Sequence, residues 1–173
     1  MATETFPGEM NDRGTVKVAD KILISNSDTD ATEYTTVQGL ITANVITRYW
    51  SCPGAHFDGL YPDTDDVSKN NYGALVIGAD GVSPRCAVFL PNGATVTGAV
   101  VYGNAGAEDD TWYLIRETLA TSTRVTVAGA NVNTEDTSID YATIDNSLYA
   151  YFIYITDLVT TDEIYGARIT YTS

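Results

Sequence analysis

The residues that could carry acid–base or nucleophilic chemistry are few in this chain. One histidine, His56, and two cysteines, Cys52 and Cys86, occur among 173 residues. Nucleophilic catalysis needs a base held beside the nucleophile, and nothing in the sequence places a hydroxyl or carboxylate beside His56. The cysteines are far apart and match neither a zinc cluster nor a redox C-x-x-C pair. We expect a loop histidine without function and two buried thiols, with a disulfide between neighbouring strands as the alternative.

Acidic residues are abundant, but their arrangement does not indicate hydrolysis. The chain has 23 Asp and Glu residues, many of them in turn-like clusters. A glycosidase needs two carboxylates, one of them with its pKa raised by an apolar pocket. Asp63 with Asp66 offers such a pair without the pocket. Phosphate-binding, dinucleotide-binding and nucleophile-elbow motifs do not occur in the sequence. The sequence predicts a protein that is not an enzyme.

One acidic stretch has the beginning of a calcium-loop spacing. Asn26, Asp28 and Asp30 match the first three ligand positions of an EF-hand loop. The sixth position is Ala31 where glycine is needed, and the twelfth is Val37 where glutamate is needed. The sequence therefore predicts neither a metal site nor a cofactor.

Aromatic residues offer a different chemistry, the stacking of rings on sugars. Trp50, Trp112, Tyr49, Tyr61 and Tyr113 could form a platform for pyranose rings, although core or subunit packing is the plainer use of large aromatic side chains. The long polar segment 53–71 is the expected surface loop, and loops on a rigid sheet commonly carry binding residues. The predicted glycan-binding residues are Trp50, His56, Phe57, Tyr61 and Asp63.

The charge of the chain excludes several classes of partner. Nine Lys and Arg residues against 23 Asp and Glu residues give a formal net charge of -14. Such a charge opposes binding to nucleic acid and to anionic membrane surfaces. No apolar run approaches the ~18 residues of a membrane span, and the start shows no signal peptide, so we expect synthesis in a cytoplasm without export.

The stretch that organises the fold is 147–158, which is apolar on both faces. With the two-residue period of a strand, Tyr149 and Tyr151 share one face, and Phe152 and Tyr154 share the other. One face can pack in a sandwich core, whereas the other needs cover from a sheet or from another copy of the chain. We therefore expect a homo-oligomer. The interface candidates are Tyr149, Tyr151, Phe152 and Tyr154.

Short strands at sandwich-like spacing follow one another over residues 47–173. We expect Tyr165, Ala167, Ile169 and Tyr171 of the last strand to face inward. The pattern predicts an all-β, jelly-roll-like antiparallel β-sandwich. The expected strands cover residues 48–52, 72–77, 86–90, 94–102, 111–119, 123–128, 147–158 and 164–172.

Residues 1–46 are predicted to be a separate attachment region. An extended polar arm over 1–16 precedes a hairpin with strands at 21–25 and near 33–34. Thr35 and Gln38 form a capping-box pattern, which predicts a short helix with one apolar face. Its face is too small to make a core alone. That face consists of Val37, Leu40, Ile41 and Val45.

The stretch D-K-I-L-I-S-N-S-D-T-D-A-T-E-Y-T-T-V-Q-G-L-I over 20–41 resembles a small module of tailed-bacteriophage structural proteins, especially fibre proteins. L-P-N-G-A-T-V-T-G-A-V-V-Y over 90–102, W-Y-L-I-R over 112–116 and I-Y-G-A-R-I-T-Y over 164–171 resemble the terminal β-sandwich domains of phage virion proteins. The resemblance implies a trimer at the end of a fibre or on a capsid surface.

Two functions follow from these expectations. The first is a virion structural protein, a capsid decoration or fibre protein, that attaches to other virion proteins through residues 1–46 and exposes the sandwich on the virion surface. The alternative is a receptor-binding or glycan-binding fibre tip, in which segment 53–71 contacts a host surface glycan.

Overall fold

The computed structural model describes residues 21–25, 32–36, 45–61 and 64–173. The chain divides into two compact units, Met1–Val45 and Ile46–Ser173. In the first unit, β1 (Lys21–Ser25) and β2 (Thr32–Thr36) pair antiparallel, which confirms the predicted hairpin. Three sequence features lie outside the described residues: the predicted arm over 1–16, the calcium-like spacing that begins at Asn26, and the predicted short helix. Of the residues named for the helix, only Thr35 and Val45 are described.

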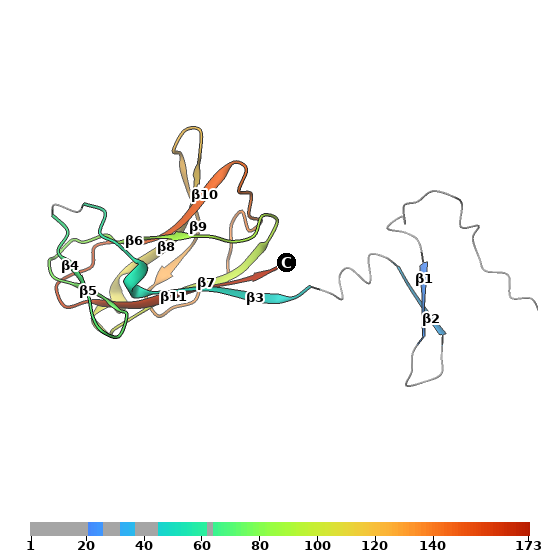
Figure 1. The fold of residues 1–173 in the computed structure, drawn as a ribbon, viewed down its shortest axis with the longest axis horizontal. Helices are drawn as coiled ribbons and strands as arrows, with labels where there is room; N and C mark the ends of the chain where they lie inside the picture. The colour runs from blue at the N-terminus through green and yellow to red at the C-terminus, as the bar shows by residue number, and fades with distance from the viewer. Residues whose placement is uncertain (1–20, 26–31, 37–44, 62–63) are drawn as a thin grey trace, which may run out of the picture. The chain divides into compact units, whose positions relative to one another are not determined.

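The second unit is a β-sandwich whose strand pairs are all antiparallel. Figure 1 shows its two sheets as two layers. This architecture confirms the predicted all-β, jelly-roll-like sandwich. The elements are β3 (Thr47–Pro53), η1 (Gly54–His56), β4 (Val67–Lys69), β5 (Leu75–Ile77), β6 (Arg85–Val88), β7 (Thr95–Gly103), η2 (Gly106–Asp109), β8 (Thr111–Thr118), β9 (Arg124–Asn131), β10 (Tyr149–Ile155) and β11 (Glu163–Thr172).

The 5-stranded sheet is built around one long central strand, β11, whereas the 4-stranded sheet has two inner strands, β10 and β8. In the 5-stranded β11 sheet, Gly166 pairs with Pro53 of β3 and with Tyr102 of β7, so these two strands flank opposite edges of β11. β5 pairs with the start of β11 and carries β4 on its other side. The 4-stranded β10 sheet has the order β6-β10-β8-β9.

The core lies between the two sheets and contains side chains from both. Trp112, Leu114 and Ile153 of the β10 sheet and Ile164 and Ile169 of the β11 sheet are completely buried. Burying such side chains contributes on the order of 1.5–3 kcal/mol each for the aliphatic ones. The core is therefore the main source of stability for the second unit.

The two faces of β10 follow the predicted alternation. Tyr151 and Ile153 point into the core, where they are 5% and 0% exposed. Phe152 and Tyr154 point to the outer face of the sheet, because their cross-strand partners Ala87 and Arg85 do so as well. The expected two-sided character of this strand is confirmed.

The alternation of the last strand is interrupted, and the prediction for Tyr165 was wrong. Tyr165 is 51% exposed, whereas its neighbour Ile164 is fully buried. The register against β7 shifts between Ile164 and Gly166, so one residue bulges out of the ladder and the inward face changes parity. A Cβ on Gly166 would stand 2.5 Å from the carbonyl oxygen of Cys52, so only glycine fits beside the bulge.

Candidate functional site

The predicted glycan-binding residues do not form one exposed surface. Trp50 is half-buried and packs against the core. Phe57 was expected in a solvated loop but is 0% exposed, because the backbones of Asp58 and Arg85 exchange two hydrogen bonds and draw this segment onto the edge of β6. That prediction was wrong. His56 is exposed and Tyr61 is 62% exposed. Asp63 lies outside the described residues.

Segment 53–71 is also more ordered than the expected surface loop. It contains the short helix η1 and the strand β4. Gly54 lies so close to β11 that an added Cβ would stand 1.8 Å from the carbonyl oxygen of Ile164. The N–H of Tyr61 donates to a carboxylate oxygen of Asp65 at 2.8 Å. The described part of this segment is therefore attached to the sandwich at several points.

Two of the four interface candidates face the core side of β10. Tyr151 is buried, and its hydroxyl oxygen accepts a hydrogen bond from the N–H of Asp145 at 2.9 Å, so it is not available to a second copy of the chain. Tyr149 packs against the core, with the guanidinium of Arg116 4.6 Å from its ring centroid. The same guanidinium lies 3.6 Å from the ring centroid of Tyr141, so Arg116 is enclosed by two aromatic rings.

The other two candidates belong to a cluster on the outer face of the β10 sheet. Tyr154 pairs with Arg85 of β6 on one side and with Tyr113 of β8 on the other. Residues that pair across antiparallel strands point to the same face, so the three side chains are neighbours. All four strands of the sheet contribute to this surface. We call it the aromatic face and define it as Arg85, Tyr113, Arg124, Phe152 and Tyr154.

The rings of the aromatic face pack against one another and between two arginines. Tyr113 and Tyr154 are stacked with ring centroids 5.2 Å apart and planes inclined by 23°. Phe152 lies 6.5 Å from Tyr154, measured between ring centroids. The guanidinium of Arg85 is 5.2 Å from the Phe152 centroid, and that of Arg124 is 5.5 Å from it. Both distances are within the range of cation–π attraction.

The two arginines differ in their partners. Arg124 forms an ion pair with Glu117 on the neighbouring strand β8. Arg85 takes part in none of the ion pairs of the described residues, and its Nε has no hydrogen-bond partner there. Asp58, whose backbone pairs with that of Arg85, forms its ion pair with Lys69 instead. Arg85 therefore presents an unneutralised cation on a strongly acidic protein.

The composition of the aromatic face suits binding rather than catalysis. Its rings are rigid apolar surfaces, and the hydroxyls of Tyr113 and Tyr154 add polar edges. A guanidinium donates hydrogen bonds from a planar fork that matches carboxylates and vicinal oxygens. None of the five residues has a carboxylate or an imidazole, and the neighbouring carboxylate of Glu117 is in the ion pair with Arg124. Among the described residues, no group of three or more His, Cys, Asp or Glu side chains could hold a metal ion.

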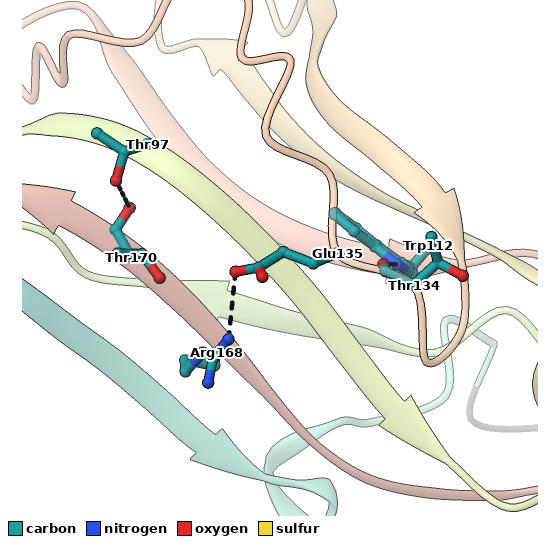
Figure 2. Close-up of polar contacts among 6 residues, drawn as sticks. All are labelled: Thr97, Trp112, Thr134, Glu135, Arg168 and Thr170. Atoms are coloured by element: carbon teal, nitrogen blue, oxygen red, sulfur yellow. Dashed lines mark hydrogen bonds and ion pairs between the residues drawn. The ribbon is translucent and has the colours of Figure 1, made fainter.

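The outer face of the β11 sheet provides a contrast. There the guanidinium of Arg168 donates to a carboxylate oxygen of Glu135 at 3.2 Å, and it also lies 5.8 Å from the ring centroid of Tyr49. The hydroxyl of Thr97 donates to the carbonyl oxygen of Thr170 at 3.3 Å. Figure 2 shows the contact of Thr97 with Thr170 across two neighbouring strands, and the contact of Arg168 with Glu135 on the segment that follows β9. Arg168 is thus ion-paired within the chain, although its Nε, like that of Arg85, has no hydrogen-bond partner among the described residues.

Sequence patterns did not single out Asp110, a carboxyl group with a raised pKa. The pKa of Asp110 is raised to about 6, because burial and the nearby negative charge of Asp162 disfavour its ionised form. Asp162 is 1% exposed and accepts a hydrogen bond from the N–H of Val159 at 2.8 Å.

No helix in the described residues is long and apolar enough to cross a membrane.

No family model and no curated protein matches the chain.

Two solved structures are similar to the chain at low sequence identity. One is the C-terminal CBM6 of LamC, a marine laminarinase from Zobellia galactanivorans, with 13% identity, a TM-score of 0.43 and coverage of 71% of this chain and 99% of that chain. The other is a family two carbohydrate esterase from Cellvibrio japonicus, with 9% identity, a TM-score of 0.37 and coverage of 74% of this chain. This chain matches only 34% of the esterase's length.

Proposed function

We propose that this chain is a non-enzymatic glycan-binding protein that contacts its ligand through the aromatic face. The observation that carries the proposal is the arrangement of Phe152 and Tyr154 beside Arg85, a cation without a carboxylate partner in the described residues. Apolar ring surface next to a planar polar donor is the combination that a sugar needs, because its ring carbons stack and its oxygens accept hydrogen bonds.

Each residue of the face has a distinct role in this proposal. Phe152 and Tyr154 supply stacking surface for a sugar ring. Arg85 binds a carboxylate or a pair of hydroxyls on the sugar. Arg124 is held by Glu117 and shields the far side of Phe152. Because Arg85 has no carboxylate partner among the described residues, it can pair with the carboxylate of an acidic sugar, and this local attraction must outweigh the repulsion from the net charge of -14.

The alternative occupant of the face is a second copy of the chain. The aromatic face fits that role less well, because the hydrophobic groups are already partly covered. Ile115, which lies on the same face as its partner Phe152, is 5% exposed, and the two rings of β10 are only partly exposed. The cores of stable interfaces are depleted of charged residues, whereas two guanidiniums stand over this cluster. The predicted homo-oligomer, with a trimer as the expected stoichiometry, stays a prediction.

We further propose that the protein acts on a virion surface, attached to other virion proteins by residues 1–46. The observation in favour is the antiparallel hairpin of β1 and β2, which lies within the stretch that resembles the bacteriophage module. If residues 1–46 bind another virion protein, the rest of the chain must fold without them to be exposed to the host. Ile46–Ser173 meets this need because it is a compact unit by itself. A capsid decoration protein and a fibre protein both fit this organisation.

Glycan titration tests the proposed binding function. Oligogalacturonate, which carries carboxylates, and a neutral maltooligosaccharide of the same length are titrated into the full-length protein by calorimetry, beside purified envelope polysaccharide of candidate hosts. Tyr154→Ala should weaken binding by roughly 5- to 150-fold, the effect of losing about 1–3 kcal/mol of stacking. Tyr165→Ala is the matched control, because it removes a tyrosine that is 51% exposed on the other sheet.

The competing outcomes are distinct. Unchanged affinity in Tyr154→Ala, with a normal melting curve, would remove the aromatic face from the binding function. An oligomeric wild type that becomes a folded monomer in Tyr154→Asp, measured by light scattering, would instead assign the face to subunit contact.

A further inference from the structure

Two thiols that the sequence leaves far apart meet in the core of the sandwich. The Sγ atoms of Cys52 and Cys86 are 3.3 Å apart. Cys52 lies on β3 of the β11 sheet, and Cys86 lies on β6 of the β10 sheet. They are 6% and 5% exposed. The contact therefore connects the two layers of the sandwich rather than two strands of one sheet.

Both strands that carry the cysteines, β3 and β6, stand at the end of the strand order of their sheet. β3 pairs only with β11 in its sheet, and β6 is likewise the terminal strand of the other sheet. A disulfide requires the sulfurs to be ~2.05 Å apart, so they must approach by about 1.3 Å. Arg85, beside Cys86, also exchanges two backbone hydrogen bonds with Asp58 on the outer side of β6. The shift should therefore fall mainly on β3, which pairs with one strand only.

We propose that Cys52 and Cys86 form an inter-sheet disulfide when the protein meets a small-molecule disulfide oxidant such as oxidised glutathione. No other cysteine exists in the chain, so each thiol has one possible intramolecular partner. A comparable bridge joins the two sheets of immunoglobulin domains, which shows that a sandwich core accommodates one.

The reaction is a two-step thiol–disulfide exchange. The thiolate of Cys86 attacks one sulfur of oxidised glutathione and displaces the first glutathione thiolate. Cys52 then loses its proton to solvent and attacks the Cys86 sulfur of the mixed disulfide, which displaces the second glutathione. Two cysteine thiols are oxidised and one glutathione disulfide is reduced to two thiols, so electrons and protons balance.

The electrostatics of the pair agree with this order of attack. The hydrogen bond between the two sulfur atoms lowers the pKa of the Cys86 thiol. The same hydrogen bond, together with burial, raises the pKa of Cys52. Since the thiolate is the attacking species, Cys86 is the first nucleophile of the pair.

The bridge would close a loop between residues 34 positions apart in the sequence. Closing a loop of this length reduces the entropy of the unfolded chain. It would also tie β3, the first strand of the second unit, to the opposite sheet. The sandwich should then resist unfolding from its N-terminal end in oxidising surroundings.

Peptide mapping of the full-length protein tests the proposal. Reduced protein is incubated with oxidised glutathione, and a second sample is refolded in its presence so that burial does not limit access. Both are alkylated under denaturing conditions, digested and analysed by mass spectrometry. We expect one cross-linked peptide containing Cys52 and Cys86, with a mass lower by two hydrogens. The melting temperature should rise by roughly 10 °C and return to its starting value with dithiothreitol.

Single variants supply the controls. Cys52→Ala and Cys86→Ala remove one sulfur each, and their melting temperatures should not respond to glutathione. Both thiols remaining open to alkylation in the refolded wild type would overturn the proposal. So would a stable glutathione adduct on either cysteine without the cross-link. Neither result depends on whether the protein binds glycans.

Discussion

The two outer faces of the sandwich use the same residue types in different ways. On the β11 sheet, Arg168 has a carboxylate partner, Glu135, at 3.2 Å. On the β10 sheet, Arg85 stands over the ring of Phe152 without a carboxylate partner in the described residues. An arginine whose charge is neutralised within the chain supports the fold, whereas one that keeps its charge can bind a ligand. For this reason we place the proposed binding site on the aromatic face.

The difference arises from one segment that follows β9. Asp136 and Ala99 of β7 exchange two backbone hydrogen bonds, so this segment runs along the free edge of β7. Its position brings Glu135 to Arg168, as Figure 2 shows. The indole N–H of Trp112 donates to the carbonyl oxygen of Thr134 at 3.3 Å and so connects the segment to the core.

The largest expected loss of stability comes from removing the Trp112 side chain, which fills the core and hydrogen-bonds the segment at Thr134. Trp112→Ala should lower the free energy of unfolding by about 3–5 kcal/mol, because it leaves a cavity beneath both faces. Trp112→Phe keeps most of the volume and removes only the indole N–H, so it should cost about 1–2 kcal/mol. Urea unfolding measures both values, and equal losses in the two variants would mean that packing at Trp112 contributes little.

Charge reversal on each face separates binding from stability. Arg85→Glu should reduce affinity for oligogalacturonate at least tenfold, about 1.4 kcal/mol, while the melting temperature changes little. Arg168→Glu should place a second carboxylate beside Glu135 and lower stability by about 1 kcal/mol without affecting binding. Calorimetry and melting curves on both variants check this reciprocal pattern. If Arg168→Glu also abolished binding, the distinction between the faces would fail.

The acidic pair at Asp110 lies outside both faces and should change stability alone. Its pKa is raised to about 6, above the ordinary 3.8, so the native state holds the proton more tightly than the unfolded chain does. The resulting stabilisation is complete below the unfolded pKa and is lost as the pH rises through the folded value. Asp110→Asn, which stays neutral, should therefore be more stable than wild type by about 1 kcal/mol near pH 7.5, after allowance for solvent screening.

Melting curves of wild type and Asp110→Asn between about pH 3.5 and 7.5 measure this effect. The gain in the variant should shrink as the pH falls and vanish near the lower end. A gain that stays constant with pH would show that titration of Asp110 is not its source. Glycan affinity should be equal in the two proteins near pH 7.5.

The smallest expected effect concerns the ion pair of the β11 face. Glu135→Gln should cost between 0 and about 1 kcal/mol, because both partners are partly exposed and solvent screens them. The cost should fall as salt is added. Chemical unfolding at low and high ionic strength measures it, and a cost that does not depend on salt would point to packing rather than charge. Glycan binding should be unaffected, which would sharpen the contrast with Arg85.

Local patterns in the sequence predicted much of the fold. The two-residue alternation in 147–158 identified β10 and its two faces, because alternation of side chains is a property of a single strand. The hairpin of β1 and β2 and the β-sandwich class also followed from strand and turn patterns. Which of the two faces is the core was left open by the alternation, and only the structure places Phe152 and Tyr154 on the outer face.

Tertiary structure decided the composition of the candidate site. Arg85 and Arg124 join Phe152 only through the strand order β6-β10-β8-β9, which no local pattern encodes. Phe57 is buried because its segment pairs with β6, and Tyr165 is exposed because a bulge reverses the parity of β11. Cys52 and Cys86 meet only once the two sheets are packed. Strand order, register shifts and sheet packing depend on contacts between distant residues, so the sequence pattern of one strand cannot specify them.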